Sequence, residues 1–419
     1  MGGSLPAASA RPGVEQPVAS SAALDEVRRE RLVRLLAAAT FLIFFQAYMV
    51  APIIPRLSTI FAVSAQTVGL IVPAYLIPYG LSTLVYGVLS DRLGRRRIML
   101  ASLTAFVLLT GLTAAARSVS ELVTIRLLTG LGASGVVPLG LALIGQVYPY
   151  ERRGRPLGWL FGAMAGGAAF GSTFGALLEP WLGWRGIFLV VSALGVVMLG
   201  LLLPYRGLLG EAPATPPTTM MDVLRGYRAL LATGRGQRTY AYVLLNSIFH
   251  SGVFTWLGLY FAQRHGLGEV GIGLALLGYG VPGFVLGPII GRAADRWGRR
   301  WLVPAGLGIA GFAAVFLIMD IPVVVAALIV TLLSLGYDMT QPLLAGIVTA
   351  LGGPRAGQAM GLNVFCLFTG FGLGSLLFGG ALGLGFGAAL AIFSAVQLAA
   401  ALAAIPLFRS ETAPVGPRP

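Results

Sequence analysis

The sequence predicts an all-α membrane protein of twelve transmembrane helices, arranged as two pseudo-symmetric six-helix bundles. Three observations predict this fold: an apolar composition, twelve apolar runs of membrane length, and a charged motif that occurs twice at corresponding places. The 419 residues are 57% hydrophobic and 11% charged, with a mean hydropathy of +0.85. An average soluble domain is about 25% charged, so this composition excludes an ordinary soluble protein.

Twelve apolar runs are long enough to cross a bilayer. A helix needs about twenty apolar residues to span the hydrocarbon core, where lipid offers no partner for a free backbone group. The expected spans are 33–54, 66–89, 98–116, 121–147, 157–178, 186–205, 239–262, 269–291, 301–319, 322–349, 357–380 and 385–407.

Polar segments precede, separate and follow two sets of six spans. The expected parts are an N-terminal tail (1–32), a six-helix bundle (33–205), a linker (206–238), a second six-helix bundle (239–407) and a C-terminal tail (408–419). The first thirty residues mix acidic and basic groups without an apolar stretch, so they predict a tail and not a cleaved signal peptide. In the linker, MMDVLRGYRALLA predicts a short amphipathic helix on the membrane surface.

The basic residues predict the orientation of the chain. All 29 are arginine, and 24 of them fall on the side of the two termini, against Arg56, Arg117, Arg185 and Arg264 on the other side. Positively charged loops stay in the cytoplasm, so we expect both termini to be cytoplasmic. The arginines then line short loops and face anionic lipid head groups, which excludes nucleic acid as a partner.

A charged segment follows the second span and is nearly repeated after the eighth. The two copies are GVLSDRLGRRR at 87–97 and GRAADRWGRR at 291–300. Their matching places indicate two halves built on one plan. At a constant offset, Gly87, Asp91, Arg92, Gly94, Arg95 and Arg96 correspond to Gly291, Asp295, Arg296, Gly298, Arg299 and Arg300.

With these two motifs in a twelve-span frame, the chain resembles the major facilitator superfamily, and within it the bacterial drug and proton antiporters. GVLSDRLGRRR matches the family signature G-x-L-[SA]-D-R-x-G-R-[RK] between the second and third helices, and GRAADRWGRR is similar to its weaker copy. In the family this loop latches the cytoplasmic ends of the halves together in the outward-open state. The resemblance therefore implies a gating role for all twelve matching residues. The alternative is that the arginines only set the topology.

The fifth span carries small residues four apart, in GAMAGGAAFGSTFGALL at 162–178. This spacing predicts close packing against another helix. The stretch also resembles the antiporter motif G-x-x-x-G-P-x-x-G-G of drug-efflux members. Ser172 stands where that motif has proline and Ala176 where it has its last glycine, so the sequence departs from the antiporter pattern at two positions.

Arg126 lies within the fourth span, in a stretch that resembles the family's fourth-helix motif of an arginine followed by G-x-G. A charge at the centre of a span costs about 2.5–3.5 kcal/mol and usually faces a polar cavity. One interpretation makes Arg126 part of a proton or substrate relay. The other places its side chain at the outer surface, within reach of Glu121.

Asp338 and His250 are the titratable candidates for proton coupling. Asp338 is the one acid that the predicted spans place in the hydrocarbon core, and His250 lies near the middle of the seventh span. The charge of a carboxylate in hydrocarbon depends on its access to water, and histidine titrates near neutral pH. We expect this pair, together with Arg126, to carry the proton. The alternative is that a backbone amide satisfies Asp338 and a neighbouring helix satisfies a neutral His250.

Polar and aromatic residues in the spans predict a mixed cavity. Gln46 occupies a place where many multidrug members have an acid, so neutral, amphipathic or anionic substrates are as compatible with the sequence as cationic ones. The cavity candidates are Gln46, Tyr48, Tyr75, Tyr79, Asn246, Trp256, Tyr279, Gln341 and Asn363.

These features predict proton-coupled efflux of a small organic molecule by alternating access, by a protein that works as a monomer in a bacterial inner membrane. The alternatives are facilitated or symport uptake of a sugar or metabolite, and a receptor built on the same frame. The sequence has no phosphate-binding glycine loop, no HExxH and no Cys/His cluster, so we expect no enzymatic activity, no cofactor and no metal. The expected partners are the substrate, protons and the lipid bilayer.

Overall fold

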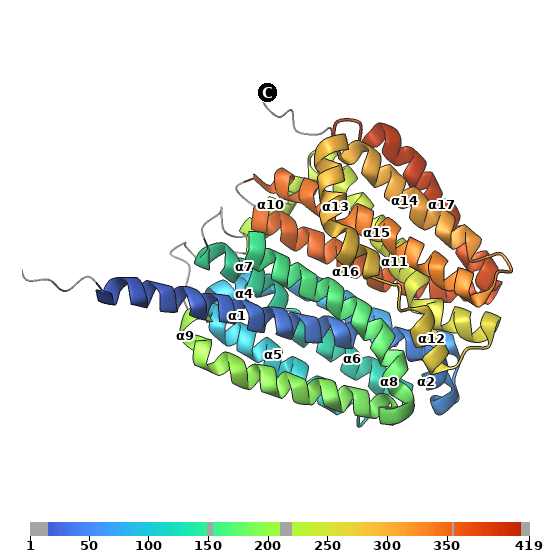
Figure 1. Ribbon diagram of the computed structural model, residues 1–419, viewed down its shortest axis with the longest axis horizontal. Coiled ribbons are helices and arrows are strands. Elements are labelled where there is room, and N and C mark those ends of the chain that lie inside the picture. The colour runs from blue at the N-terminus through green and yellow to red at the C-terminus, as the bar shows by residue number, and fades with distance from the viewer. Residues whose placement is uncertain (1–15, 149–153, 210–219, 354–355, 412–419) are drawn as a thin grey trace, which may run out of the picture.

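The structure is a computed structural model that describes residues 16–148, 154–209, 220–353 and 356–411. Within these ranges every regular element is a helix. The predicted tails and linker lie partly outside the described residues. In Figure 1 the blue and green half of the chain lies beside the yellow and red half, and the helices of both run roughly along the long axis.

The first half contains nine helical elements. They are α1 (Gln16–Tyr48), η1 (Ala51–Ile53), α2 (Ile54–Phe61), α3 (Ala65–Gly69), α4 (Ile71–Leu93), α5 (Arg95–Thr113), α6 (Val119–Ala133), α7 (Val136–Val147) and α8 (Gly154–Leu202).

The linker and the second half follow. Their elements are η3 (Leu203–Tyr205), α9 (Arg206–Leu209), α10 (Met220–Leu231), α11 (Gly234–His265), α12 (Glu269–Ala275), α13 (Val281–Trp297), α14 (Arg299–Phe316), α15 (Val323–Gly352), α16 (Ala356–Ala381), η5 (Leu382–Leu384) and α17 (Phe386–Leu407).

Nine stretches of the described chain are long and apolar enough to cross a membrane. The longest contains α8, which holds two predicted spans because the chain reverses at Gly183, where φ is 64° and ψ is 160° (Figure 1). The broken pair α12 and α13 and the arginine-led α14 do not meet that criterion, yet they occupy the places of the predicted eighth and ninth spans. The fold is therefore the expected all-α fold of twelve passes.

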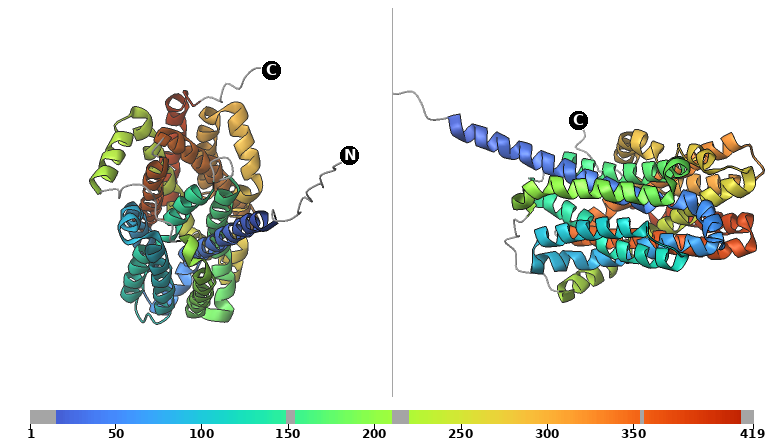
Figure 2. Two further views of the ribbon diagram at one scale, coloured as in Figure 1. Left: turned by 90° about the vertical axis from the view of Figure 1, so that its left-hand side faces the viewer. Right: turned by 90° about the horizontal axis from the view of Figure 1, so that it is seen from below.

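Several helices extend beyond the predicted spans or break within them. The first pass runs on through η1 and α2 to Phe61, because Pro52 and Pro55 stand in first turns of helices, where a missing N–H costs nothing. Helix α1 begins at Gln16, within the predicted tail, and its first turns project beyond the bundle in Figure 2. The second, fourth and eighth spans are each broken into two helices.

The repeat of the sequence is a repeat of backbone conformation. Gly94 joins α4 to α5 with φ 89° and ψ 131°, and its counterpart Gly298 joins α13 to α14 with φ 81° and ψ 155°. The turn glycines Gly183 and Gly385 form a second pair, with φ 64° and 96°. Only glycine adopts these angles without strain, so the motif glycines are required by the turns.

The glycines of the fifth pass lie against α1, as their spacing predicts. A Cβ on Gly167, Gly171 or Gly175 would lie 2.3–2.5 Å from a backbone carbonyl oxygen of Phe41, Phe45 or Met49. The predicted amphipathic helix is α10, and it packs on α16, where the Gln358 side chain donates to the Val223 carbonyl at 3.1 Å.

The two halves meet where α4 contacts α16, where α8 contacts α12, and where η1 and α2 contact α11. We call the end of the bundle near α2 and α12 the far end, and the end near α9 and α10 the tail end (Figure 1). At the far end the halves touch closely: a Cβ on Gly258 would lie 2.6 Å from the Pro52 carbonyl oxygen, and Thr173 donates to the Leu276 carbonyl at 3.4 Å.

Candidate functional site

Arg126 is completely buried in α6 and is bound by acceptors on two neighbouring helices. Its guanidinium donates to the side-chain oxygen of Gln46 at 2.8 Å and to the backbone carbonyls of Gln46, Ala47 and Ile71 at 3.2–3.3 Å. The guanidinium carbon also lies 4.3 Å from the centre of the Tyr75 ring. The structure thus joins three of the predicted site residues into one cluster in the first half.

The alternative interpretation of Arg126, with its side chain at the outer surface near Glu121, is wrong. Glu121 instead accepts a hydrogen bond from the backbone N–H of Arg117 at 2.8 Å, at the start of α6. The fully buried guanidinium points the other way, toward α1 and α4.

In the second half, His250 is held by two tyrosines. Its imidazole is hydrogen-bonded to the Tyr279 hydroxyl and stacks on the Tyr337 ring, with ring centres 3.7 Å apart and planes 24° apart. His250 is 5% exposed. Tyr279 was predicted as a cavity residue, whereas Tyr337 was missed, although it stands directly before Asp338 in the sequence.

Asp338 is half-buried in α15 and contacts the eighth pass. It accepts a hydrogen bond from the Ser334 hydroxyl at 3.1 Å and another from the backbone N–H of Gly283. A Cβ on Gly283 would lie 2.7 Å from the carboxyl carbon, so only glycine permits this approach. Asp338 and His250 therefore have separate partners in this structure. These partners are of the kind expected under the alternative interpretation, in which a backbone amide binds Asp338 and a neighbouring helix binds His250.

His250 and Asp338 are nevertheless both linked to one segment, the break between α12 and α13 at 276–280. Tyr279, which binds His250, lies in the break, and Ser334, which binds Asp338, accepts the backbone N–H of Gly280 at 2.9 Å. Gly280 has φ 80°, and a Cβ there would lie 2.5 Å from Ala169 in α8 of the other half. The break thus links the two titratable residues to the first half.

Two further cavity candidates have packing contacts. Asn246 donates to the Thr340 hydroxyl at 2.8 Å and accepts from Gln397 at 3.1 Å, within the second half. Trp256 donates to the Ser375 carbonyl at 3.1 Å, and its ring fills the space beside Gly69 of the first half. Thr340 and Gln397 were not among the predicted site residues, although each is a polar residue in an apolar span and could have been found by that signal.

Aromatic rings bridge the two halves. Tyr48 of α1 lies 5.7 Å from Phe254 and 6.3 Å from Phe371, measured between ring centres. Tyr79 of α4 lies 4.3 Å from Phe368. The three phenylalanines were not predicted, since phenylalanine is common in every span and its sequence position does not show which way it faces.

Several buried polar atoms of the predicted cavity residues, and the hydroxyl of Thr369, have no hydrogen-bond partner among the described residues. They belong to two helices of the first half and two of the second. They are Nε2 of Gln46, the hydroxyls of Tyr75 and Tyr79, both amide atoms of Gln341, Oδ1 of Asn363 and the hydroxyl of Thr369.

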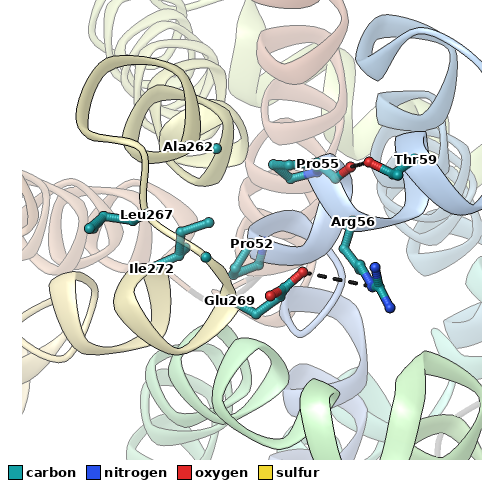
Figure 3. Close-up of a pocket in the computed structure, with 9 residues that line it drawn as sticks. Pro52, Pro55, Arg56, Thr59, Ala262, Leu267, Glu269 and Ile272 are labelled. Carbon is teal, nitrogen blue, oxygen red and sulfur yellow. Dashed lines mark hydrogen bonds and ion pairs between the residues drawn. The ribbon is translucent and has the colours of Figure 1, made fainter.

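At the far end, three charged residues lie where the halves meet. Arg56 of α2 lies 3.5 Å from Glu179 of α8 and 3.7 Å from Glu269 of α12, measured from its Nε. Figure 3 shows Arg56 and Glu269 next to each other in the lining of a small cleft of about 140 Å³, which residues of both halves line. Glu179 is 4% exposed, so Arg56 compensates a buried carboxylate.

The two charged loops of the repeat lie at the tail end. Arg92 and Arg96 are exposed while Arg95 is buried, and the structure does not describe the surroundings of Gly87, Asp91, Gly291 and Asp295. In the second loop, Arg296 and Arg300 are exposed and Arg299 is half-buried. The backbone N–H of Arg300 donates to the carbonyl of Glu411 at 3.0 Å.

Glu411 also anchors the start of α11. Its carboxylate accepts two hydrogen bonds from Arg235 at 2.7 Å and one from Arg238 at 2.6 Å. Burial raises the pKa of Glu411, but the hydrogen bonds and charges of the two arginines outweigh burial and hold that pKa below its usual value. The segment after α17 is thereby tied to the second loop and to the seventh pass.

Comparison with known proteins places this geometry in a family. The model of the Major Facilitator Superfamily matches residues 36–285 and 239–419. The uncharacterized MFS-type transporter YceJ of Bacillus subtilis (strain 168) is 26% identical over 345 residues, which cover 81% of this chain and 86% of the relative. A chloramphenicol resistance protein of Streptomyces lividans is 26% identical over 326 residues, with 76% and 81% covered.

Solved structures share the fold. A bacterial homolog to the human lysosomal transporter Spinster, in an inward-facing and unoccupied conformation, superposes with a TM-score of 0.71 at 17% identity and covers 92% of this chain and 98% of that one. The family model matches most of the sequence, and the structure agrees with it in its twelve passes, its paired loops and its paired glycines. The chain is therefore an integral membrane transporter that belongs to the Major Facilitator Superfamily.

Proposed function

We propose that this transporter exports small organic molecules from a bacterial cytoplasm in exchange for protons. It works as a monomer in the inner membrane, and its tail end faces the cytoplasm. Two observations support this proposal: the resemblance to a chloramphenicol resistance protein, and the placement of a half-buried carboxylate, Asp338, against a broken transmembrane pass.

The contacts of Asp338 carry the proposal. Its ionised form accepts the Ser334 hydroxyl and the Gly283 N–H, and binding a proton removes the charge that makes those two hydrogen bonds strong. Ser334 also accepts the Gly280 N–H, and Gly280 lies against Ala169 of the other half. Protonation of Asp338 would thus loosen the α12 to α13 break at the place where it touches α8.

The closed far end supports alternating access. The halves touch there through Gly258 with Pro52 and Thr173 with Leu276, so this state closes the central residues off from the far side. For export the far end must open, and the halves then rock about the central residues. We propose that the two charged loops hold the tail end together in that second state.

Proton movement in proteoliposomes tests this function. Purified protein is reconstituted with a pH-sensitive dye inside and a proton gradient, and candidate drugs, chloramphenicol among them, are added in turn, with sugars and amino acids as the uptake alternative. We expect substrate to trigger proton movement in the wild type and not in Asp338→Asn. Asp320→Asn is the matched control, since Asp320 is an exposed acid at the far end. Flux without proton movement in both proteins would mean a uniporter.

A further inference from the structure

The two charged residues of the central region already have protein partners. Arg126 donates to four acceptors and lies over an aromatic ring. Asp338 accepts one hydroxyl and one backbone N–H. A charged ligand would lose its hydration on entry, and that loss is compensated only by an opposite charge that is free to pair with it. A guanidinium bound by four carbonyl-type oxygens offers little to an organic anion.

Neutral hydrogen-bonding groups, in contrast, are left over. The hydroxyls of Tyr75 and Tyr79 and the amide nitrogen of Gln46 are buried in side chains that are 0–1% exposed, and no described residue binds them. On the second half, the amide atoms of the half-buried Gln341 and the carbonyl oxygen of the buried Asn363 also have no partner among the described residues. An unpaired buried polar group costs about 1–3 kcal/mol, so these groups favour a ligand that brings both donors and acceptors.

Aromatic faces lie beside those polar groups. Tyr75 and Tyr79 stack one helical turn apart on α4, with ring centres 5.9 Å apart, and Tyr79 contacts Phe368 of the other half. Tyr337 and Gln341 are likewise one turn apart on α15, so they share a face of that helix. Offset and edge contacts between rings stabilise by about 0.5–1.5 kcal/mol beyond burial, which favours a ligand with an aromatic ring.

We propose that this central region selects uncharged aromatic molecules that carry both hydrogen-bond donors and acceptors, over organic cations and anions. The proposal rests on the proposed export function and adds its substrate class. It has an electrical consequence. Exchange of a neutral molecule for a proton moves one net charge across the membrane, so the membrane potential alone should drive it, whereas exchange of a monovalent cation for one proton is electrically silent.

A matched set of ligands tests the charge preference. One set is chloramphenicol, its deacylated amine, which is a cation, and its hemisuccinate, which is an anion; a second set is benzamide, benzylamine and benzoate. Binding to the full chain in nanodiscs is measured by thermal stabilisation and by competition. We expect the neutral member of each set to bind at least about 10-fold more tightly than both charged members. Equal or tighter binding of the cation or anion, or failure of every neutral member to bind, overturns the proposal.

Removal of single hydroxyls tests the residues. Tyr75→Phe and Tyr79→Phe keep the ring and delete one hydrogen-bonding group, so each should weaken binding of the neutral ligand about 3- to 10-fold, the equivalent of one neutral hydrogen bond. Tyr260→Phe is the control, since the Tyr260 hydroxyl is also unpartnered in the described chain but its ring contacts His265 and Phe386 at the far end. Unchanged binding in both Tyr75→Phe and Tyr79→Phe overturns the assignment.

The failure of this proposal differs from the failure of the export function. If organic cations trigger proton movement and neutral ligands do not, proton-coupled export stands and the substrate class is wrong. If neutral ligands bind and are transported with no proton movement and no response to a potassium and valinomycin potential, the substrate class stands and antiport is wrong.

Discussion

Arg56 and Glu269 join the two halves of the transporter at the far end, with the Arg56 Nε 3.7 Å from the Glu269 carboxylate, and Arg56 also lies 3.5 Å from the buried Glu179 of its own half. Opening of the far end must separate Arg56 from Glu269, because they belong to different halves. It need not separate Arg56 from Glu179. Arg56 can therefore keep Glu179 as a partner in both states, whereas its pairing with Glu269 depends on the conformational state.

We predict that Arg56→Gln and Glu269→Gln shift the transporter toward opening at the far end. Arg56 and Glu269 are 46% and 31% exposed, and a surface pair contributes about 0.2–1 kcal/mol, so we expect a shift of about 1.4- to 5-fold for Glu269→Gln. Arg56→Gln should shift the equilibrium by a similar factor, since the Arg56–Glu179 pair that it also removes is present in both states. The readout is the labelling rate of Thr173→Cys by a membrane-impermeant maleimide, in a background where the single cysteine, Cys366, is serine.

The control for this experiment is Arg185→Gln. Arg185 donates to the Ala114 and Ala116 carbonyls at 3.1 and 2.9 Å, within the first half at the same end. Its loss removes a far-end arginine without touching the junction of the halves. If Arg185→Gln and Arg56→Gln accelerate labelling equally, net charge and not the pair controls the far end.

The glycines of α8 lead to a second prediction, which concerns stability. At Gly171 a Cβ would lie 2.5 Å from the Phe45 carbonyl oxygen, so Gly171→Ala forces α1 and α8 apart. Overpacking of this kind costs about 1–3 kcal/mol. At Gly162 no described atom outside the backbone of its own helix lies within 4 Å of the added Cβ, so Gly162→Ala should be neutral or stabilise by up to about 1 kcal/mol through helix propensity. Thermal unfolding in detergent should separate the two variants, and equal midpoints would contradict the packing argument.

Much of the fold followed from local pattern in the sequence. The apolar runs gave the twelve passes, and the repeated motif gave the halves, because Gly94 and Gly298 occupy turns that only glycine forms readily. The breaks at Leu70 and at 276–280 were missed, since hydropathy averages over a window and registers no change of backbone direction. The eighth pass is the clearest case, because its break contains Gly278 and Gly280 and is followed by Pro282 in the first turn of α13, yet the apolar run continues across all three.

Parts of the candidate site were beyond sequence reasoning for a different reason. Burial of Arg126 among Gln46, Tyr75 and two backbone segments depends on which faces of α1, α4 and α6 meet. Arg56, Glu179 and Glu269 come from three distant segments of the sequence. Their association depends on how the halves pack, which no local pattern specifies.

Glu411 leads to a prediction about pH. Arg235 and Arg238 hold its pKa below the usual 4.5, so the ionised carboxylate stabilises the folded state above pH 4.5, and this contribution is lost as the pH falls through the lowered pKa. At pH 7, Glu411→Gln should cost about 2 kcal/mol, the range of a charge-assisted hydrogen bond. As the pH falls below 4.5 and through the lowered pKa, the wild type and the variant should converge in thermal stability.

The matched control for Glu411 is Asp320→Asn, which changes an exposed acid at the other end of the molecule. It should leave both the midpoint at pH 7 and its pH dependence as in the wild type. A gap between the wild type and Glu411→Gln that persists unchanged down to pH 3 would show that the carboxylate charge does not anchor this segment.

The last prediction separates a bracing role of Arg126 from a relay role. Arg126→Lys keeps the charge but replaces a planar fork that reaches acceptors on α1 and α4 with a single ammonium. Loss of two hydrogen bonds from a buried cation should cost at least about 3 kcal/mol, and Gln46→Ala about 1–3 kcal/mol through loss of one acceptor. Unfolding in detergent and substrate-triggered proton movement are measured on the same preparations. If Arg126→Lys unfolds at a markedly lower temperature while surviving protein still moves protons, Arg126 is a brace between α1, α4 and α6. If its stability equals that of the wild type and proton movement is abolished, the guanidinium takes part in the relay, and the four oxygens around it must exchange with substrate or water during the cycle.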